Sequence, residues 1–279
     1  MTSPSPTFGQ RRLARALRRL RTEAGLTIDQ VAEKLELSPS TVSRMETAQA
    51  GVRRPDLSAL LDLYQVTGVQ RDKLSRMVDE SRKEPWWQEY RDVRSAPVAD
   101  LEAEADSIAQ FSTLLVPGLL QTETYARAVL TAIRADATPD LRRLRLRTQR
   151  QAMLVAQKLP RYEVIVDEAV LRRAFGGHEV MRAQLDHLID AAALPNVTIR
   201  VLPFSAGAHA GVDGDFTIYM YQEDSDDPDV VYFETAVGEV YLEDASTTEV
   251  YRWIFDQLQA LALDPNASIQ MITDIRDQL

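Results

Sequence analysis

The sequence predicts two domains of different fold class, a mainly α N-terminal bundle and an α+β C-terminal domain. Apolar residues recur every three or four positions in the N-terminal third, as on amphipathic helices, whereas from Arg161 onward short segments alternate as strands do. Length agrees, because 279 residues exceed one typical domain. We place the domains at 1–84 and 98–279, joined by a linker at 85–97.

Composition excludes several classes of protein. No run of about 18 apolar residues is present to span a membrane, and Met1–Thr7 reads as a leader rather than a targeting segment. The absence of cysteine removes disulfides, thiolate metal sites and a cysteine nucleophile, and it fits a reducing compartment. We therefore expect a cytoplasmic protein with no membrane partner.

The segment Leu26–Glu46 predicts two short helices joined by a tight turn. Thr27 and Gln30 have the spacing of a capping box, which fixes the start of the first helix. Ser38 can cap a second helix whose first position is Pro39, where the missing N–H costs nothing. Such a helix-turn-helix would lie at the centre of the N-terminal bundle.

The second of these helices has the chemistry of a DNA-reading helix. Val42 and Met45 face inward, which leaves outside Ser40, Thr41, Ser43 and Arg44. Small side chains let the backbone approach base edges, and arginine can donate two parallel hydrogen bonds to guanine. The alternative is a helical hairpin with a polar exposed face.

Amphipathic helices are also expected on both sides, at Gln10–Arg21, Pro55–Tyr64 and Val69–Lys83. The whole stretch resembles the lambda-repressor-like, or xenobiotic-response-element-type, helix-turn-helix domain, a dimeric DNA binder. The residues that carry the resemblance are Arg21, Gly25, Leu26, Thr27, Ala32, Leu37, Ser38, the run Val42–Glu46 and Leu60–Tyr64. The resemblance implies a structural ion pair between Arg21 and Glu46.

Two residues depart from the family pattern. Ile28 stands where a Gln often contacts DNA, and Ala48 stands where a Gly usually ends the recognition helix. The second departure suggests a longer loop, Thr47–Arg54. We expect Ser38, Ser40, Thr41, Ser43 and Arg44 to face the major groove, and Thr27, Gln49, Arg53 and Arg54 to contact phosphates.

The two predicted domains carry net charges of opposite sign. Residues 1–85 carry 15 Lys/Arg and 11 Asp/Glu, a net charge of +4, while the remainder carries 17 and 31, a net charge of −14. Attraction to phosphates acts over roughly 8–10 Å at physiological salt, so the local charge matters most. The acidic remainder should lower the affinity for bulk DNA.

Helices are expected first in the C-terminal domain. Val98–Phe111 reads as one helix with an acidic side (Asp100, Glu102, Glu104 and Asp106), and Glu123–Arg134 as another. Pro139–Lys158 predicts a long helix with a basic stripe: Arg142, Arg143, Arg145, Arg147 and Arg150. These arginines could touch nucleic acid, but in an acidic domain we favour pairing with neighbouring acids.

A mixed sheet flanked by helices is expected next. Tyr162–Val166 and Val197–Leu202, separated by a helix at Val180–Ala192, predict a parallel pair. Three strands in meander order follow at Phe216–Tyr221, Val230–Glu234 and Gly238–Leu242, and helices at Thr247–Leu263 and Asn266–Leu279 close the chain. The acidic segment Gln222–Asp229 lacks calcium-loop spacing and reads as a solvated connection.

No catalytic, cofactor or metal motif is recognisable, so we expect a protein that is not an enzyme and needs no cofactor. Asp167 and Glu168 could hold a base or a ligand, yet helix capping explains them as well. The loop Gly207–Gly211, with His209, could close over a small molecule or could be a plain connector. Trp86 and Trp87 are adjacent, and we favour structural anchors over ligand contacts. The possible ligand or partner site is therefore Trp86, Trp87 and His209.

The C-terminal sequence resembles the large domain of actinobacterial WhiJ-type regulators. The blocks that carry it include Trp86–Trp87, Glu102–Ala105, Val116–Glu123, Tyr125–Ala128, Arg147–Gln151, Asp167–Glu168, Pro195–Val197, Val201–Phe204, Gly207–His209 and Val230–Glu234. Such proteins are regarded as transcriptional regulators, often described as antitoxin-like, and are commonly encoded beside a small acidic partner protein.

The sequence therefore predicts a homodimeric regulator that binds a near-palindromic site in double-stranded DNA. Its C-terminal domain would serve dimerisation and would bind a ligand or a small partner protein. The alternative is an antitoxin-like protein whose main role is to bind that small acidic partner, with DNA binding for autoregulation. An enzyme that uses Asp167, Glu168 and His209 is a third hypothesis, which we do not favour.

Overall fold

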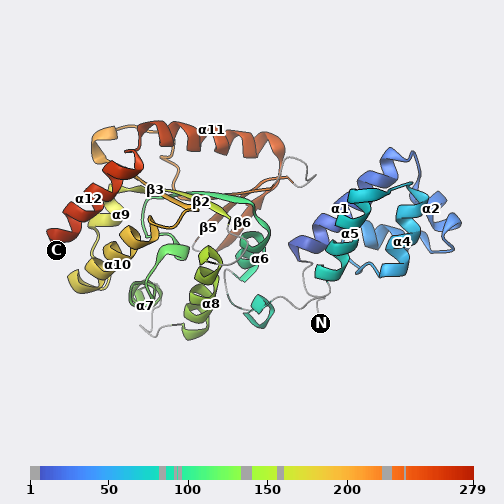
Figure 1. Cartoon of the computed structure of the whole chain (residues 1–279), viewed down its shortest axis with the longest axis horizontal. Helices are drawn as coiled ribbons and strands as arrows, with labels where there is room; N and C mark the ends of the chain where they lie inside the picture. The colour runs from blue at the N-terminus through green and yellow to red at the C-terminus, as the bar shows by residue number, and fades with distance from the viewer. Residues whose placement is uncertain are drawn as a thin grey trace. The chain divides into compact units, whose positions relative to one another are not determined.

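The computed structural model describes residues 7–81, 86–90, 93, 96–132, 140–155, 160–221, 228–235 and 237–279. These residues form two compact units, one up to Glu89 and one from Tyr90 onward (Figure 1). Residues 1–6 of the expected leader and 222–227 of the acidic segment lie outside the described ranges. Within those ranges, no helix is both long enough and apolar enough to cross a membrane.

The N-terminal unit is helical, as predicted. Its helices are α1 (Phe8–Glu23), α2 (Ile28–Lys34), α3 (Pro39–Glu46), α4 (Arg54–Leu63) and α5 (Gly68–Ser81), and a short 3-10 helix, η1 (Trp86–Tyr90), follows in the chain. Helix α1 begins earlier than expected because Thr7 and Gln10 form a capping box. The Thr7 backbone donates to Gln10 Oε1 (3.0 Å), and the Gln10 backbone donates to Thr7 Oγ1 (3.2 Å).

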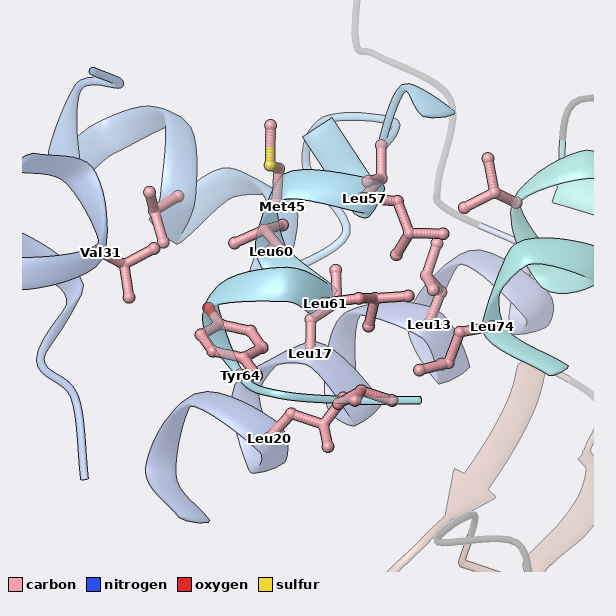
Figure 2. Packing of buried hydrophobic residues seen from close by; sticks show 14 of the residues in the cluster. Leu13, Leu17, Leu20, Val31, Met45, Leu57, Leu60, Leu61, Tyr64 and Leu74 are labelled. Atoms are coloured by element: carbon pink, nitrogen blue, oxygen red, sulfur yellow. The ribbon is translucent and has the colours of Figure 1, made fainter. Parts of the chain in front are cut away.

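A single hydrophobic cluster fills this unit. Leucines from the inner stripes of α1 and α4 form its centre, with α3 and α5 adding to it (Figure 2): Leu13, Leu17, Leu20, Leu57, Leu60, Leu61, Met45 and Leu74. All of these side chains are less than one-tenth exposed. Burial of apolar surface contributes about 25 cal/mol of stability per Å², so the inner face of α3 is held firmly against the cluster. Its outer face takes no part in this packing.

The C-terminal unit contains a six-stranded mixed sheet with the strand order β3-β2-β1-β4-β5-β6. The strands are β1 (Ser107–Ser112), β2 (Arg161–Asp167), β3 (Val197–Leu202), β4 (Phe216–Met220), β5 (Val230–Thr235) and β6 (Gly238–Leu242). Strands β1, β2 and β3 are parallel, whereas β4, β5 and β6 run antiparallel in meander order. The expected α+β class, the parallel β2–β3 pair and the meander are confirmed.

Helices cover both faces of the sheet. They are α6 (Ala96–Glu104), η2 (Gly118–Leu120), α7 (Glu123–Ala132), α8 (Leu141–Gln151), η3 (Ala152–Val155), α9 (Glu168–Arg172), α10 (His178–Ala191), η4 (Phe204–Ala206), α11 (Ala245–Leu261) and α12 (Pro265–Asp277). Helix α11 lies across one face, and α6, α7 and α8 lie on the other (Figure 1).

The two faces of the sheet differ in chemistry. Under α11 the strands present an apolar cluster with Phe111, Phe216, Ile218 and Val231. Alternate residues of the same strands point to the opposite face, where the polar or aromatic residues Gln110, Thr217, Tyr219 and Tyr232 lie beside the apolar Ile108 and Val230. The opposite face is therefore buried and mixed in chemistry.

The expected helix over Val98–Phe111 was wrong in its second half. Helix α6 ends at Glu104, and Ser107–Ser112 form β1, which lies in the middle of the sheet. The segment SIAQFS has little intrinsic strand preference, but it gains backbone partners on both sides, β2 and β4, and this tertiary pairing overrides the local signal. Glu102, expected on an acidic side of that helix, is only 2% exposed.

The basic helix is also shorter than expected. Helix α8 ends at Gln151, η3 continues to Val155, and the remaining expected helical residues, Pro139 and 156–158, lie outside the described ranges. The expected pairing with acids holds for Arg143, which contacts Glu234, and for Arg150, which contacts Glu102. Arg147 differs, because its hydrogen-bond acceptor is the neutral amide of Gln121.

We predict that Gly211→Ala destabilises the C-terminal unit by about 1–3 kcal/mol. A Cβ atom at Gly211 would lie 2.5 Å from Cε1 of Phe111 and 3.0 Å from Cδ1 of Leu258, and neither core side chain can move freely. Gly238→Ala is the control, since a Cβ atom there meets nothing within 4 Å. Urea unfolding measures both, and equal midpoints for the two variants would contradict the prediction.

Candidate nucleic-acid interface

Side-chain caps set the geometry of the α2–turn–α3 segment. The Thr27 backbone donates to Gln30 Oε1 (2.9 Å), and the Gln30 backbone donates to Thr27 Oγ1 (3.2 Å), which completes the predicted capping box. Ser38 Oγ accepts from the Thr41 backbone (3.1 Å) and starts α3 directly before Pro39. The cap residues thus define where α3 begins, and its first turn is exposed.

The outer face of α3 carries a cluster of hydroxyl groups. Ser38 Oγ lies 2.9 Å from Ser40 Oγ and 2.8 Å from Thr41 Oγ1, at hydrogen-bond distance in both cases. Three hydroxyls have three O–H donors, and these two contacts use two of them. One donor and several lone pairs therefore stay available on a surface that a base edge can approach.

Arg44 lies further along the same helix with its guanidinium uncommitted. Its side chain is exposed and forms no hydrogen bond or ion pair with any residue that the structure describes. Val42 and Met45 beside it are buried in the core, as predicted. The backbone carbonyl of Arg44 accepts from the Gln49 (2.9 Å) and Ala50 (3.1 Å) backbones, so the helix end that carries it is held.

Arg53 and Arg54, expected on phosphates, are already engaged with acids. Arg53 Nε and Nη2 contact the two carboxylate oxygens of Asp56 at 2.7 and 3.0 Å. Arg54 makes the same two-point contact with Asp79, with Nε at 2.7 Å. Each guanidinium keeps donors for a phosphate, but the neighbouring carboxylate reduces its net attraction. Neither acid was predicted as a partner from the sequence, although Arg53 and Asp56 have the i,i+3 spacing of a pair at a helix start.

The ion pair implied for Arg21 and Glu46 is present and joins α1 to α3. Arg21 Nε and Nη2 donate to Oε1 and Oε2 of Glu46 at 2.8 and 3.0 Å, and Nη1 donates to the Leu26 carbonyl at 2.8 Å. The two side chains are 14% and 5% exposed. The hydrogen bond with Glu46 raises the pKa of Arg21, and burial raises the pKa of the neighbouring Tyr64.

The loop after α3 contains a left-handed residue. Ala48 has φ +56°, a conformation that costs a residue with a Cβ about 1–2 kcal/mol. This position is where the resembling family usually has Gly, and α4 begins at Arg54, as the expected loop implied. Gln49 is exposed in this loop.

The three residues of the possible ligand or partner site belong to two different units. Trp86 and Trp87 belong to the N-terminal unit and His209 to the other; the side chain of Trp86 lies outside the described part, and Trp87 is half-buried. His209 packs edge-on against Phe111, with ring centroids 5.9 Å apart, and its Nδ1 accepts from the Gly211 backbone. These contacts give His209 a packing role.

Asp167 and Glu168 also have structural partners. Asp167 caps α9 by accepting from the Ala169 backbone (2.8 Å), as the capping alternative proposed. Glu168 accepts from Arg172 Nε (2.6 Å) and from the Phe204 backbone (2.8 Å). Among the described residues, no cluster of three or more His, Cys, Asp and Glu side chains could hold a metal ion.

Comparison with known proteins divides the chain in two. Residues 12–74 match a family described as a helix-turn-helix domain, and residues 95–274 match one described as a domain of unknown function, DUF5753. No curated protein and no solved structure matches. The first match supports a DNA-binding domain in the N-terminal unit.

We predict that Glu46→Gln lowers the free energy of unfolding of the N-terminal unit by about 2–4 kcal/mol, because it leaves the partly buried Arg21 without its counter-charge. Asp62→Asn is the matched control. It breaks the Arg71–Asp62 pair, in which the aspartate is 67% exposed, and should change stability by less than about 1 kcal/mol. If chemical denaturation gives similar losses of unfolding free energy for both variants, the Arg21–Glu46 pair contributes no more stability than an exposed pair does.

We predict that Ala48→Gly stabilises the same unit by roughly 1 kcal/mol, because glycine adopts the left-handed conformation without strain. Ala50→Gly, in the same loop but without a positive φ, should be neutral or destabilising. Thermal unfolding compares the two variants, and a lower midpoint for Ala48→Gly would contradict the argument.

Proposed function

Since the chain belongs to the DUF5753 family and carries an N-terminal helix-turn-helix DNA-binding domain, we propose that it is a sequence-specific transcriptional regulator of the xenobiotic-response-element type. We further propose that it acts as a homodimer and that its C-terminal domain binds a ligand or a small partner protein. The resemblance to WhiJ-type regulators supports the second statement.

The observation that carries the proposal is the outer face of α3. It combines exposed small hydroxyls with an arginine that has no acidic partner among the described residues. Arginine can read guanine through O6 and N7 only if both edge donors are available, and Arg44 meets this condition while Arg53 and Arg54 do not. We therefore assign base recognition to Arg44 and phosphate contacts to Thr27, Gln49, Arg53 and Arg54.

The homodimer follows from the size of the reading surface. About three or four side chains of one short recognition helix reach base edges, and the few base pairs that they read are too few to specify one site in a genome. Two copies related by a two-fold axis would read a near-palindromic operator. The net charge of −14 in the C-terminal part disfavours contacts of that part with DNA phosphates.

We predict that Arg44→Ala costs about 1–3 kcal/mol at one base-pair position of each half-site and relaxes selectivity there. Fluorescence anisotropy of the full chain on DNA from its own upstream region, against scrambled DNA at two salt concentrations, measures this. Arg76→Ala, which removes an exposed charge on α5, is the control and should keep the ratio between the two DNAs.

Arg53→Ala should behave differently from Arg44→Ala. It should weaken binding to all sequences alike and make the salt dependence less steep by about one ion. An unchanged site preference in Arg44→Ala would remove that residue from base recognition.

The antitoxin-like alternative gives the C-terminal domain a partner protein as its main ligand. It is favoured by exposed apolar side chains spaced along α11: Val250, Trp253 and Leu261. Co-purification with the product of the neighbouring gene, lost in Trp253→Glu, would support it; an unaltered co-purification would place the contact elsewhere.

We propose no catalytic role, and the structural contacts of Asp167, Glu168 and His209 support this.

A further inference from the structure

The C-terminal unit encloses a polar cavity of about 80 Å³ beneath α6, η2 and α8. Its floor is the polar part of the mixed face of β1, β4 and β5, with Gln110, Thr217, Tyr219 and Tyr232. One water molecule needs about 10–15 Å³ by the same measure, so the space exceeds a single water several-fold. It has the size of a small polyatomic group such as a carboxylate or a phosphate.

The floor of the cavity offers ordered hydrogen-bonding groups. Tyr162 donates its hydroxyl to Gln110 Oε1 (2.6 Å), which fixes the orientation of the Gln110 amide. Burial, and then the charge of Glu102, raises the pKa of Tyr162 and of Tyr219. Both hydroxyls therefore stay protonated over the physiological range, and the one that lines the cavity is that of Tyr219, since Tyr162 donates its hydrogen bond to Gln110.

Three arginines of α8 line or flank the cavity on the side opposite the sheet. Arg143, Arg147 and Arg150 are spaced four and three residues apart, so they share one helix face, and each is at least nine-tenths buried. Two of them are neutralised. Arg150 donates to both carboxylate oxygens of Glu102, with 2.8 Å between Nε and Oε2, and Arg143 Nη2 donates to Oε1 of Glu234.

Arg147 has no such counter-charge. It is 9% exposed, and its hydrogen bond from Nη1 reaches the neutral Oε1 of Gln121 at 2.6 Å. Neither Nε nor Nη2 has a partner among the residues that the structure describes. Burial, followed by the charges of Arg150 and Arg143, lowers the pKa of Arg147 to about 10, so the guanidinium still carries its charge at neutral pH.

A buried charge without a counter-charge is costly, since desolvation is not offset by an ion pair. Here the charges around the cavity are three guanidiniums and two carboxylates, which leaves one positive charge beside an open space. Nε and Nη2 form the edge of the guanidinium that binds an oxyanion through two parallel hydrogen bonds.

We propose that this cavity binds the oxyanion group of a small molecule, a carboxylate or a phosphate, with Arg147 as its counter-charge. The bound group would accept from Nε and Nη2 of Arg147 and from the hydroxyls of the floor. This inference rests on the proposed regulatory function in one respect: the bound molecule would be the effector. The binding itself does not depend on DNA.

The structure suggests an isosteric test. Gln121→Glu puts a carboxylate 2.6 Å from Arg147 Nη1 and so supplies a counter-charge within the chain. The same change removes the buried hydrogen bond that Gln121 Nε2 donates to the Val116 carbonyl (2.6 Å), so the two effects on stability oppose each other and the melting temperature in chloride alone is not the readout. The readout is the response to added anion, which the variant should lose.

The experiment is thermal unfolding of the full chain in sodium phosphate, sodium acetate or sodium chloride at equal, low millimolar ionic strength. The wild type should show a saturable rise in melting temperature with phosphate or acetate over chloride, and the larger rise identifies the class of anion. Arg147→Met should lose the rise, whereas Arg145→Met, which removes an exposed arginine of the same helix, should keep it.

Two outcomes would overturn the binding site, and a third would overturn its role as an effector site. Equal melting temperatures in all three salts would mean that the cavity holds water, and an equal rise in Gln121→Glu would place anion binding elsewhere. Anion binding that leaves the DNA affinity unchanged would remove the effector role while keeping the site. Because the melting experiment contains no DNA, its failure is distinct from a failure of site-selective DNA binding.

Discussion

A buried guanidinium is stabilised by an anionic partner, and this requirement links distant parts of the chain in both units. Arg21 of α1 meets Glu46 at the end of α3, and Arg150 of α8 meets Glu102 of α6. In each case both partners are largely buried and both carboxylate oxygens are used. A shift of either element by one residue would strand a charge in the interior, so these pairs restrict how the elements can pack.

The same requirement explains how surface and interior arginines differ in this protein. Arg53 and Arg54 are exposed but paired, so their charge is partly compensated before any polyanion arrives. Arg44 is exposed and has no partner for its guanidinium among the described residues, whereas Arg147 is buried and its hydrogen bond goes to the neutral amide of Gln121. Among the described arginines without a carboxylate partner, Arg44 on α3 lies beside the hydroxyl cluster and Arg147 on α8 lies beside the polar cavity, where an external anionic group fits the chemistry.

Much of the N-terminal unit was predictable because its signals are local. The capping box at Thr27, the Ser38–Pro39 start and the inward Val42 and Met45 all lie within one or two turns of the helices that they define. The Arg21–Glu46 pair came from family resemblance rather than spacing. The carboxylate that holds Arg54 could not be predicted, since Asp79 is 25 residues from its partner and no local pattern indicates such a contact, whereas the i,i+3 spacing of Arg53 and Asp56 was a local signal that was missed.

The C-terminal unit was less predictable for the same reason. The local sequence of β1 has little strand preference, and the strand forms because it pairs with segments far along the chain. Glu102 has the sequence context of a solvent-facing acid, but it is buried in an ion pair with Arg150, 48 residues away. The cavity could not be predicted from the sequence, because it depends on which faces of α8 and of three strands pack against each other. His209 had a distinctive sequence context, yet its position is explained by packing on Phe111.

The placement of β1 has a consequence for how the chain acquires its structure during synthesis. Ser107 pairs with Arg161 on one side and with Met220 on the other, so the centre of the sheet waits for segments made more than fifty and more than a hundred residues later. Contacts so distant in sequence form slowly, whereas every helix from α1 to α5 has been made by Ser81, before any residue of β1. The N-terminal unit can therefore fold while the chain is still on the ribosome and the sheet is still incomplete, so the helix-turn-helix domain is available before the C-terminal unit has formed.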